Sequence, residues 1–204
     1  YDGLKRLTKL AEINTDTVPA SVEGYAVNYT YDLNDNVTEI TYDSSLGTEV
    51  SGVKYVYENN RLKEVKVKIG STYYLAKGYT YNLDGSVETV KDYYNFRSGG
   101  AEYMLLTYTY DSFGRVASMV YTLENDIVES HSYAYDKNNN IVREVNVNTY
   151  AGVNEVREYT YDYMAQLKKS VLDNENNVLT TVYTYDKVGN RISKTENGSV
   201  TSYT

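Results

Sequence analysis

Few residues in this chain of 204 could carry out catalytic or metal chemistry. His131 is the only histidine, and cysteine is absent. A zinc site needs several histidine or cysteine ligands, and a catalytic triad needs its histidine in a converging set. Without thiols there is no cysteine nucleophile and no disulfide framework. We therefore expect no catalytic residues, no metal site and no bound cofactor, and we expect that the chain is not an enzyme.

The acidic side chains are the other candidates for chemistry. Two Asp/Asn-rich segments, residues 32–36 and 173–177, faintly resemble calcium-binding loops. They lack the glycine at the sixth position and the glutamate at the twelfth. Asp and Asn also favour turns by hydrogen-bonding to nearby backbone, which explains both segments without a metal. Counting carboxylates leaves a paired-carboxylate hydrolase open, but here the carboxylates recur with the turns, as a structural role predicts.

Composition excludes two further classes. The net charge is −8, whereas binding to nucleic acid needs a basic face. No apolar run approaches the roughly 20 residues of a membrane-spanning helix. The chain has 26 tyrosines against two phenylalanines and no tryptophan, and only one proline. Tyrosine favours a pleated, half-buried surface, so this profile indicates a β-rich protein. Asn28, Asn36 and Asn197 lie in N-x-[Ser/Thr] sequons, which matter only if the source glycosylates secreted proteins.

The tyrosines belong to an internal repeat. Tyr-Asp, or a close variant, recurs every 24 to 30 residues, and from the second copy onward another tyrosine lies two residues earlier. Glu58 and Asn82 replace the aspartate in the third and fourth copies. We expect one array of eight repeats over residues 1–204, with repeats starting at Tyr1, Tyr31, Tyr57, Tyr81, Tyr110, Tyr135, Tyr161 and Tyr185.

The spacing of the repeat predicts a hairpin. Tyr-x-Tyr places both rings on one face of a strand, because side chains alternate with period two. Asp111-Ser112-Phe113-Gly114 has the signature of a type I turn closed by a left-handed glycine, with the Asp side chain accepting hydrogen bonds from the turn's own N–H groups. Lys5 and Ala165 depart from this rule at the fourth position. The third copy, residues 57–62, is one residue short and predicts a tighter turn.

A second strand follows each turn and begins at an apolar residue, from Leu7 in the first copy to Ile192 in the eighth. A second turn must then return the chain to the next Tyr-x-Tyr. The candidates for this turn are residues 15–24, Leu46-Gly47, Gly70-Ser71, Gly99-Gly100, Asn125-Asp126, Gly152, residues 174–177 and Asn197-Gly198.

Eight such repeats predict an all-β fold of about sixteen antiparallel strands in a hairpin meander. A twisted open sheet rarely exceeds about 10 strands without curling, so we expect a spiral or shell segment. The residues expected to define the repeat structurally are Tyr29, Tyr31, Asp32, Tyr108, Tyr110, Asp111, Gly114, Tyr133, Tyr135, Asp136, Tyr159, Tyr161, Asp162, Tyr183, Tyr185, Asp186 and Gly189.

Two segments, Tyr110 to Val116 and Tyr185 to Arg191, carry the pattern Tyr-Asp-x-x-Gly-[Arg/Asn]. In this they resemble the Rhs/YD-repeat family, which includes bacterial Rhs and wall-associated toxins, shell subunits of insecticidal toxin complexes and the animal teneurins. The resemblance implies a β-shell wound from hairpins, which in the toxin proteins encloses a C-terminal effector. The family's Asp-Pro self-cleavage motif has no counterpart here, since the only proline follows Val18.

Two functions follow from the resemblance and the tyrosine-rich face. The first is a non-enzymatic segment of a β-shell that encloses a polypeptide cargo, such as a toxin, in a secreted or cell-surface protein that is more often bacterial than animal. The second is an extracellular carbohydrate-binding or adhesion module. The chain begins Tyr1-Asp2 without a methionine, so we expect a piece of a longer protein whose further repeats and plug domains are its nearest partners.

Overall fold

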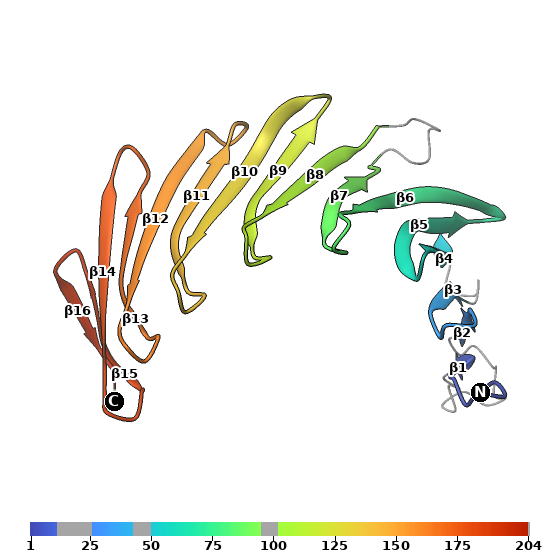
Figure 1. The fold of residues 1–204 in the computed structure, drawn as a ribbon, viewed down its shortest axis with the longest axis horizontal. Helices are drawn as coiled ribbons and strands as arrows, with labels where there is room; N and C mark the ends of the chain where they lie inside the picture. The colour runs from blue at the N-terminus through green and yellow to red at the C-terminus, as the bar shows by residue number, and fades with distance from the viewer. Residues whose placement is uncertain (12–25, 43–49, 95–101, 204) are drawn as a thin grey trace, which may run out of the picture. The chain divides into compact units, whose positions relative to one another are not determined.

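The computed structural model describes residues 1–11, 26–42, 50–94 and 102–203. No helix lies among these residues, and Figure 1 shows the strands as successive hairpins along the chain. The sixteen strands are β1 (Lys9–Ala11), β2 (Ala26–Tyr31), β3 (Val37–Tyr42), β4 (Val50–Glu58), β5 (Arg61–Ile69), β6 (Thr72–Tyr81), β7 (Val87–Asp92), β8 (Met104–Tyr110), β9 (Val116–Leu123), β10 (Asp126–Tyr135), β11 (Ile141–Asn148), β12 (Val153–Tyr161), β13 (Leu167–Asp173), β14 (Val178–Tyr185), β15 (Arg191–Glu196) and β16 (Ser199–Ser202).

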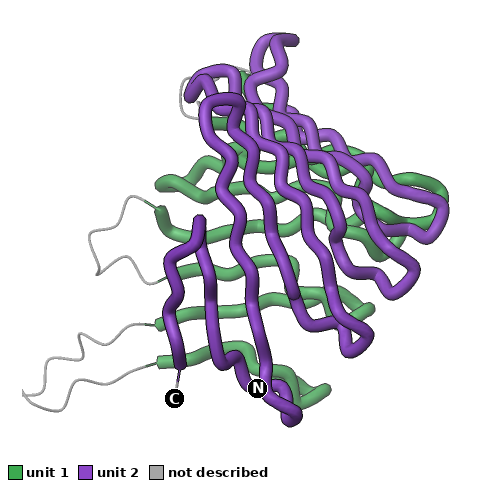
Figure 2. The backbone as a smooth tube through the Cα atoms, turned by 90° about the vertical axis from the view of Figure 1, so that its left-hand side faces the viewer, with its two compact units in different colours: residues 1–104 green, residues 105–204 purple. Residues whose placement is uncertain are grey.

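The predicted meander is confirmed. The strands form an open sheet whose order follows the chain from β1 to β16. Every strand pairing whose residue register is defined within the described residues is antiparallel, for example β4 with β5 and β14 with β15. The chain divides into two compact units, residues 1–104 and 105–204, which Figure 2 colours separately. The grouping of all eight repeats into one domain stays a prediction.

A β-bulge precedes the second tyrosine of the repeat in six copies. In the second copy, for example, Thr30 pairs with Glu39 but Tyr31 pairs with Val37, so one residue of β3 is left over. The same shift occurs before Tyr57, Tyr81, Tyr135, Tyr161 and Tyr185. A turn that ends with a left-handed residue produces this kind of bulge. Because the bulge recurs, the second tyrosine has the same offset from its cross-strand partner in these six hairpins.

The described residues form little closed core. Only Ala26, Gly52, Val128 and Thr181 are buried, and no side chain is fully buried. Most strand residues are half-buried, because a sheet of one layer leaves both of its faces in contact with solvent. Stability must therefore come mainly from contacts between neighbouring strands, as in other repeat proteins.

The turns at the other ends of the hairpins largely follow the predictions. Gly70 has φ 60° in the two-residue turn between β5 and β6, and Asn197 and Gly198 have φ 45° and 88° between β15 and β16. Positive φ also occurs at Gly152 and at Glu175 within residues 174–177. The predictions at residues 15–24, Leu46-Gly47 and Gly99-Gly100 lie outside the described residues.

One turn was predicted one residue too late. The loop between β9 and β10 is Glu124-Asn125, not Asn125-Asp126, because Leu123 pairs with Asp126 across it. Glu124 and Asn125 both have positive φ, at 50° and 77°, as a type I′ turn requires. Asparagine tolerates this conformation well, whereas glutamate at the other central position gave no turn signature in the sequence.

Candidate functional site

The Tyr-Asp turn is an arrangement of polar side chains that recurs in most copies of the repeat. In the fifth copy, Asp111 Oδ1 accepts hydrogen bonds from the backbone N–H groups of Phe113 and Arg115, at 2.8 and 3.0 Å. The backbone closes the same loop, with Asp111 N–H donating to Arg115 O and Gly114 N–H donating to Asp111 O. The aspartate therefore satisfies N–H groups that the turn would otherwise leave without partners.

The same pair of bonds to backbone N–H groups two and four residues later forms in five other copies, at Asp2, Asp32, Asp136, Asp162 and Asp186. The fourth copy has Asn82 instead. There the backbone bonds persist, and Asp84 Oδ1 accepts from Ser86 N–H at 2.9 Å. The third copy forms the tighter turn that its length predicts, with Asn59 and Asn60 at φ 51° and 60°.

The fourth position of the longer turns is left-handed whatever residue occupies it. Gly114 and Gly189 have φ 77° and 94°, and Lys5 and Ala165 adopt 64° and 59°. A residue with a Cβ pays about 1–2 kcal/mol for this conformation, so the surrounding turn overrides the local preference at Lys5 and Ala165. The aspartate bonds to the backbone and the backbone bonds within the turn together hold this conformation.

The turn bonds also change the acidity of the aspartates. A hydrogen bond from the Asn36 side chain, assisted by backbone N–H groups, lowers the pKa of Asp32 below its ordinary value of 3.8. Bonds from Asn140 lower the pKa of Asp136 and bonds from Asn190 lower that of Asp186 in the same way. These carboxylates are therefore held ionised as acceptors, which suits a structural role and not that of a proton donor.

The second tyrosine of the motif joins its hairpin to the preceding one in most copies. Tyr135 Oη donates to the backbone carbonyl of Val116, at 2.9 Å, and Val116 is the residue that begins the second strand of the previous repeat. Six copies make this bond, at distances from 2.6 to 3.1 Å: Tyr31 to Leu7, Tyr57 to Val37, Tyr81 to Leu62, Tyr135 to Val116, Tyr161 to Ile141 and Tyr185 to Leu167. We call this bond the tyrosine staple.

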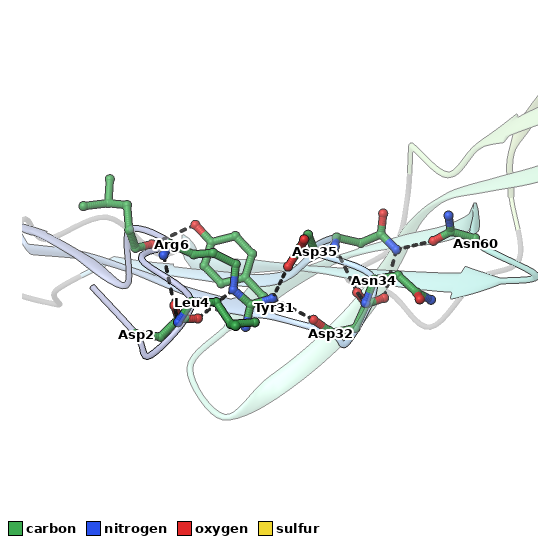
Figure 3. Close-up of polar contacts among 10 residues, drawn as sticks. Asp2, Leu4, Arg6, Tyr31, Asp32, Asn34, Asp35 and Asn60 are labelled. Atoms are coloured by element: carbon green, nitrogen blue, oxygen red, sulfur yellow. Dashed lines mark hydrogen bonds and ion pairs between the residues drawn. The ribbon is translucent and has the colours of Figure 1, made fainter.

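An arginine strengthens the same junction in two repeats. Figure 3 shows Arg6 lying between its own turn and the next one. Its Nε donates to Asp2 Oδ2, and its Nη1 donates to Asp32 O at 2.9 Å and to Asp35 Oδ1 at 2.7 Å. The guanidinium also lies 4.7 Å from the centre of the Tyr31 ring. Arginine supplies both a planar fork of donors and a cation for the ring, so one side chain couples two turns.

The first tyrosines of the motif lie inside strands. They are Tyr29 in β2, Tyr55 in β4, Tyr79 in β6, Tyr108 in β8, Tyr133 in β10, Tyr159 in β12 and Tyr183 in β14. Tyr159 Oη donates to Glu144 Oε2 at 3.1 Å, and burial together with this bond raises the pKa of Tyr159. The guanidinium carbon of Arg191 lies 4.5 Å from the centre of the Tyr183 ring. The rings of Tyr108 and Tyr110 stack with their centres 6.4 Å apart.

His131 lies on β10 beside Glu129, whose Oε1 is 2.8 Å from His131 Nε2. His131 Nδ1 and the Oδ1 atom of the cross-strand residue Asn146 are buried without a hydrogen-bond partner. Among residues 1–11, 26–42, 50–94 and 102–203, no three His, Cys, Asp or Glu side chains gather as metal ligands would. The described residues also contain no helix that is long and apolar enough to cross a membrane.

Two partners in the junction were not expected from sequence. The staple's acceptor is a backbone carbonyl, which no residue type specifies. The bridging arginine occupies the position after the turn glycine in Tyr-Asp-x-x-Gly-[Arg/Asn], and its recurrence there could have pointed to a role.

Comparisons with known proteins give weak structural similarity only. No family model matches this sequence, and no curated protein matches it. Among solved structures, a crystal structure of TcdB2-TccC3 is similar with a TM-score of 0.31 and 11% identity, over 98% of this chain and 16% of that one. A second TcdB2-TccC3 structure, without the hypervariable C-terminal region, gives 0.30 and 11%, over 97% and 15%. A porin-like protein from Bacteroides uniformis gives 0.41 and 12%, over 96% and 92%. These values do not assign the chain to a family.

Proposed function

We propose that this chain is a wall segment of an Rhs/YD-type β-shell that encloses a polypeptide cargo and catalyses no reaction itself. The observation that carries the proposal is the junction between hairpins. The Tyr-Asp turn recurs with the same internal hydrogen bonds in most copies, and the tyrosine staple joins successive hairpins through a backbone carbonyl at the same position of the repeat. A chain whose recurrent side chains shape the turns and join the hairpins in this way builds an extended wall.

The thin sheet supports the same role. Both faces of a one-layer sheet keep half-exposed apolar and tyrosine side chains, with only Ala26, Gly52, Val128 and Thr181 buried among the described residues. Burying apolar surface is favourable by about 25 cal/mol per Å², so such a wall gains stability from a polypeptide that covers one of its faces. A cargo enclosed by the wall would supply that cover.

The parent protein provides the test. We expect its reading frame to contain further Tyr-Asp repeats and a C-terminal domain beyond them. In the intact parent, limited proteolysis should spare that C-terminal domain and should digest it rapidly when it is expressed alone. Equal digestion of the domain in both forms, or a reading frame that ends within the repeats, would contradict the proposal.

Carbohydrate binding by the tyrosine-rich face is the second candidate. The first tyrosines, such as Tyr29 and Tyr133, are half-exposed on their strands, and their rings offer flat apolar surfaces on which sugars can stack. A glycan array followed by titration with oligosaccharides tests this function, and signals no higher than background would exclude it.

A further inference from the structure

The groove between the seventh and eighth Tyr-Asp turns lacks the bridging arginine of its counterpart earlier in the chain. It is an open hollow of about 470 Å³ whose lining includes Met164, Gln166, Tyr185, Asp186 and Lys187. A hollow of about 410 Å³ between the fifth and sixth turns is lined by the residues at the equivalent positions of the repeat, namely Phe113, Arg115, Tyr135, Asp136, Lys137 and Asn139. The two grooves are therefore the same structural site in two copies.

In the groove between the fifth and sixth turns, the Arg115 guanidinium bridges both turns by hydrogen bonds and lies against a tyrosine ring. Its Nε donates to Asp111 Oδ2 at 2.8 Å, and its Nη1 donates to Asp136 O at 3.1 Å and to Asn139 Oδ1 at 2.8 Å. It also lies 4.4 Å from the centre of the Tyr135 ring. Arg6 makes the same set of contacts between the first and second turns, so this chain uses the site twice to bind a guanidinium.

In the groove between the seventh and eighth turns, Gln166 occupies the arginine position and makes none of these bonds. Asp162 forms the usual turn, with its Oδ1 accepting from the backbone N–H groups of Met164 and Gln166. Within the described part of the chain no hydrogen bond reaches Asp162 Oδ2, the atom that corresponds to the acceptor of the Arg115 Nε. The carbonyl of Asp186 and the ring of Tyr185 stand where Asp136 O and Tyr135 receive Arg115.

We propose that this groove binds a guanidinium group and that its ligand is the arginine side chain of another polypeptide. Asp162 Oδ2 and Asp186 O would accept the planar fork of N–H donors, and the Tyr185 ring would stack against it. A lysine ammonium cannot satisfy both acceptors and the ring in this planar arrangement, which makes the site selective for arginine. The proposal does not depend on the shell function.

Three differences limit the affinity of the site. The Gln166 side chain reaches across the groove, with its Nε2 atom 3.1 Å from the position that a Cβ on Gly189 would take, so it must move aside for a ligand. Gly189 stands where Asn139 provides a third acceptor, and Lys168 adds a positive charge that Ala117 lacks at the equivalent position. Lys187 is not a difference, since Lys137 lies in the groove that holds Arg115. Binding of a single arginine should therefore be weak, and neighbouring contacts of the polypeptide must add to it.

The test is an NMR titration of the whole chain with N-acetyl-arginine amide, with N-acetyl-lysine amide as the matched control. We expect saturable shifts of the Met164 and Gly189 amides with the arginine compound only. Gln166→Arg should abolish these shifts because the chain then supplies its own guanidinium, whereas Gln166→Lys should not reproduce the contacts of Arg115. Arg115→Gln should create a second binding site, seen at the amides of Phe113 and Asn139.

Three results would overturn the proposal. They are equal binding of the lysine and arginine compounds, arginine-induced shifts that persist in Gln166→Arg, and the absence of a second site in Arg115→Gln when its spectrum shows a folded chain. An arginine-containing peptide, compared with the same peptide carrying lysine, tests whether the guanidinium can come from a polypeptide. If N-acetyl-arginine amide binds but the arginine peptide does not, then the assignment of the ligand to a polypeptide is wrong.

Discussion

Replacing Tyr135 with phenylalanine isolates the energy of one tyrosine staple. The change removes the hydroxyl that donates to Val116 O at 2.9 Å and keeps the ring that lies against Arg115. A net intramolecular hydrogen bond contributes about 1 kcal/mol, so we expect a loss of about that size in the free energy of unfolding. In a chain of this length the loss corresponds to a fall in Tm of about 2–4 °C.

Tyr150 provides the matched control. Its side chain is 78% exposed, and its hydroxyl has no hydrogen bond within the described residues. Tyr150→Phe should therefore change the stability by less than about 0.5 kcal/mol. Urea unfolding followed by circular dichroism measures both variants.

A double variant tests whether the staples act independently. Tyr185 lies four strands beyond Tyr135, or about 19 Å at the usual strand spacing, and makes the same bond to Leu167 O. At that separation the two losses should add, so Tyr135→Phe with Tyr185→Phe should lower the free energy of unfolding by about 2 kcal/mol. If Tyr135→Phe costs no more than Tyr150→Phe, the staple does not stabilise the sheet and our reasoning about it is wrong.

Three further predictions concern the turns. Ala165→Gly should raise the free energy of unfolding by about 0.5–1 kcal/mol, because glycine adopts φ 59° without the steric cost that alanine has. Gly189→Ala should lower the free energy of unfolding for the same reason, and calorimetry would show both shifts. The folded state lowers the pKa of aspartates such as Asp136 below 3.8. Their contribution to stability should therefore be fully present above pH 3.8 and be lost as the pH falls, because the unfolded chain then binds protons first. Urea midpoints measured against pH test this, and Asp136→Asn should weaken the pH dependence. Arg115→Lys should speed hydrogen exchange at the sixth turn, because an ammonium cannot bridge Asp136 O and Asn139 Oδ1 while stacking on Tyr135; unchanged exchange would argue against the bridge.

The repeat in the sequence was enough to predict the strands, their antiparallel order and the Tyr-Asp turns. These features depend on local rules: the period-two alternation of Tyr-x-Tyr and the tendency of aspartate to bond to the backbone ahead of it. Sequence also predicted the short third turn, because a residue is missing between Tyr57 and Leu62.

The features that sequence missed depend on contacts between repeats. The acceptor of the Tyr135 staple is the carbonyl of Val116, and any residue at that position offers the same carbonyl. The left-handed conformation of Ala165 is likewise imposed by its turn and not by alanine itself. The open groove at Gln166 could be recognised only after Arg115 was seen to bridge two turns at the equivalent position.

Hydrogen exchange measured residue by residue tests most directly whether the Tyr-Asp junction ties each hairpin to its neighbours. In Tyr135→Phe, under conditions where the chain stays folded, exchange should rise at the turn amides of residues 111–115 and 136–140, on either side of the lost bond. Exchange at residues 32–36, in the other unit, should not change. A uniform rise throughout the described strands, or no rise at the two adjacent turns, would contradict the role of the junction.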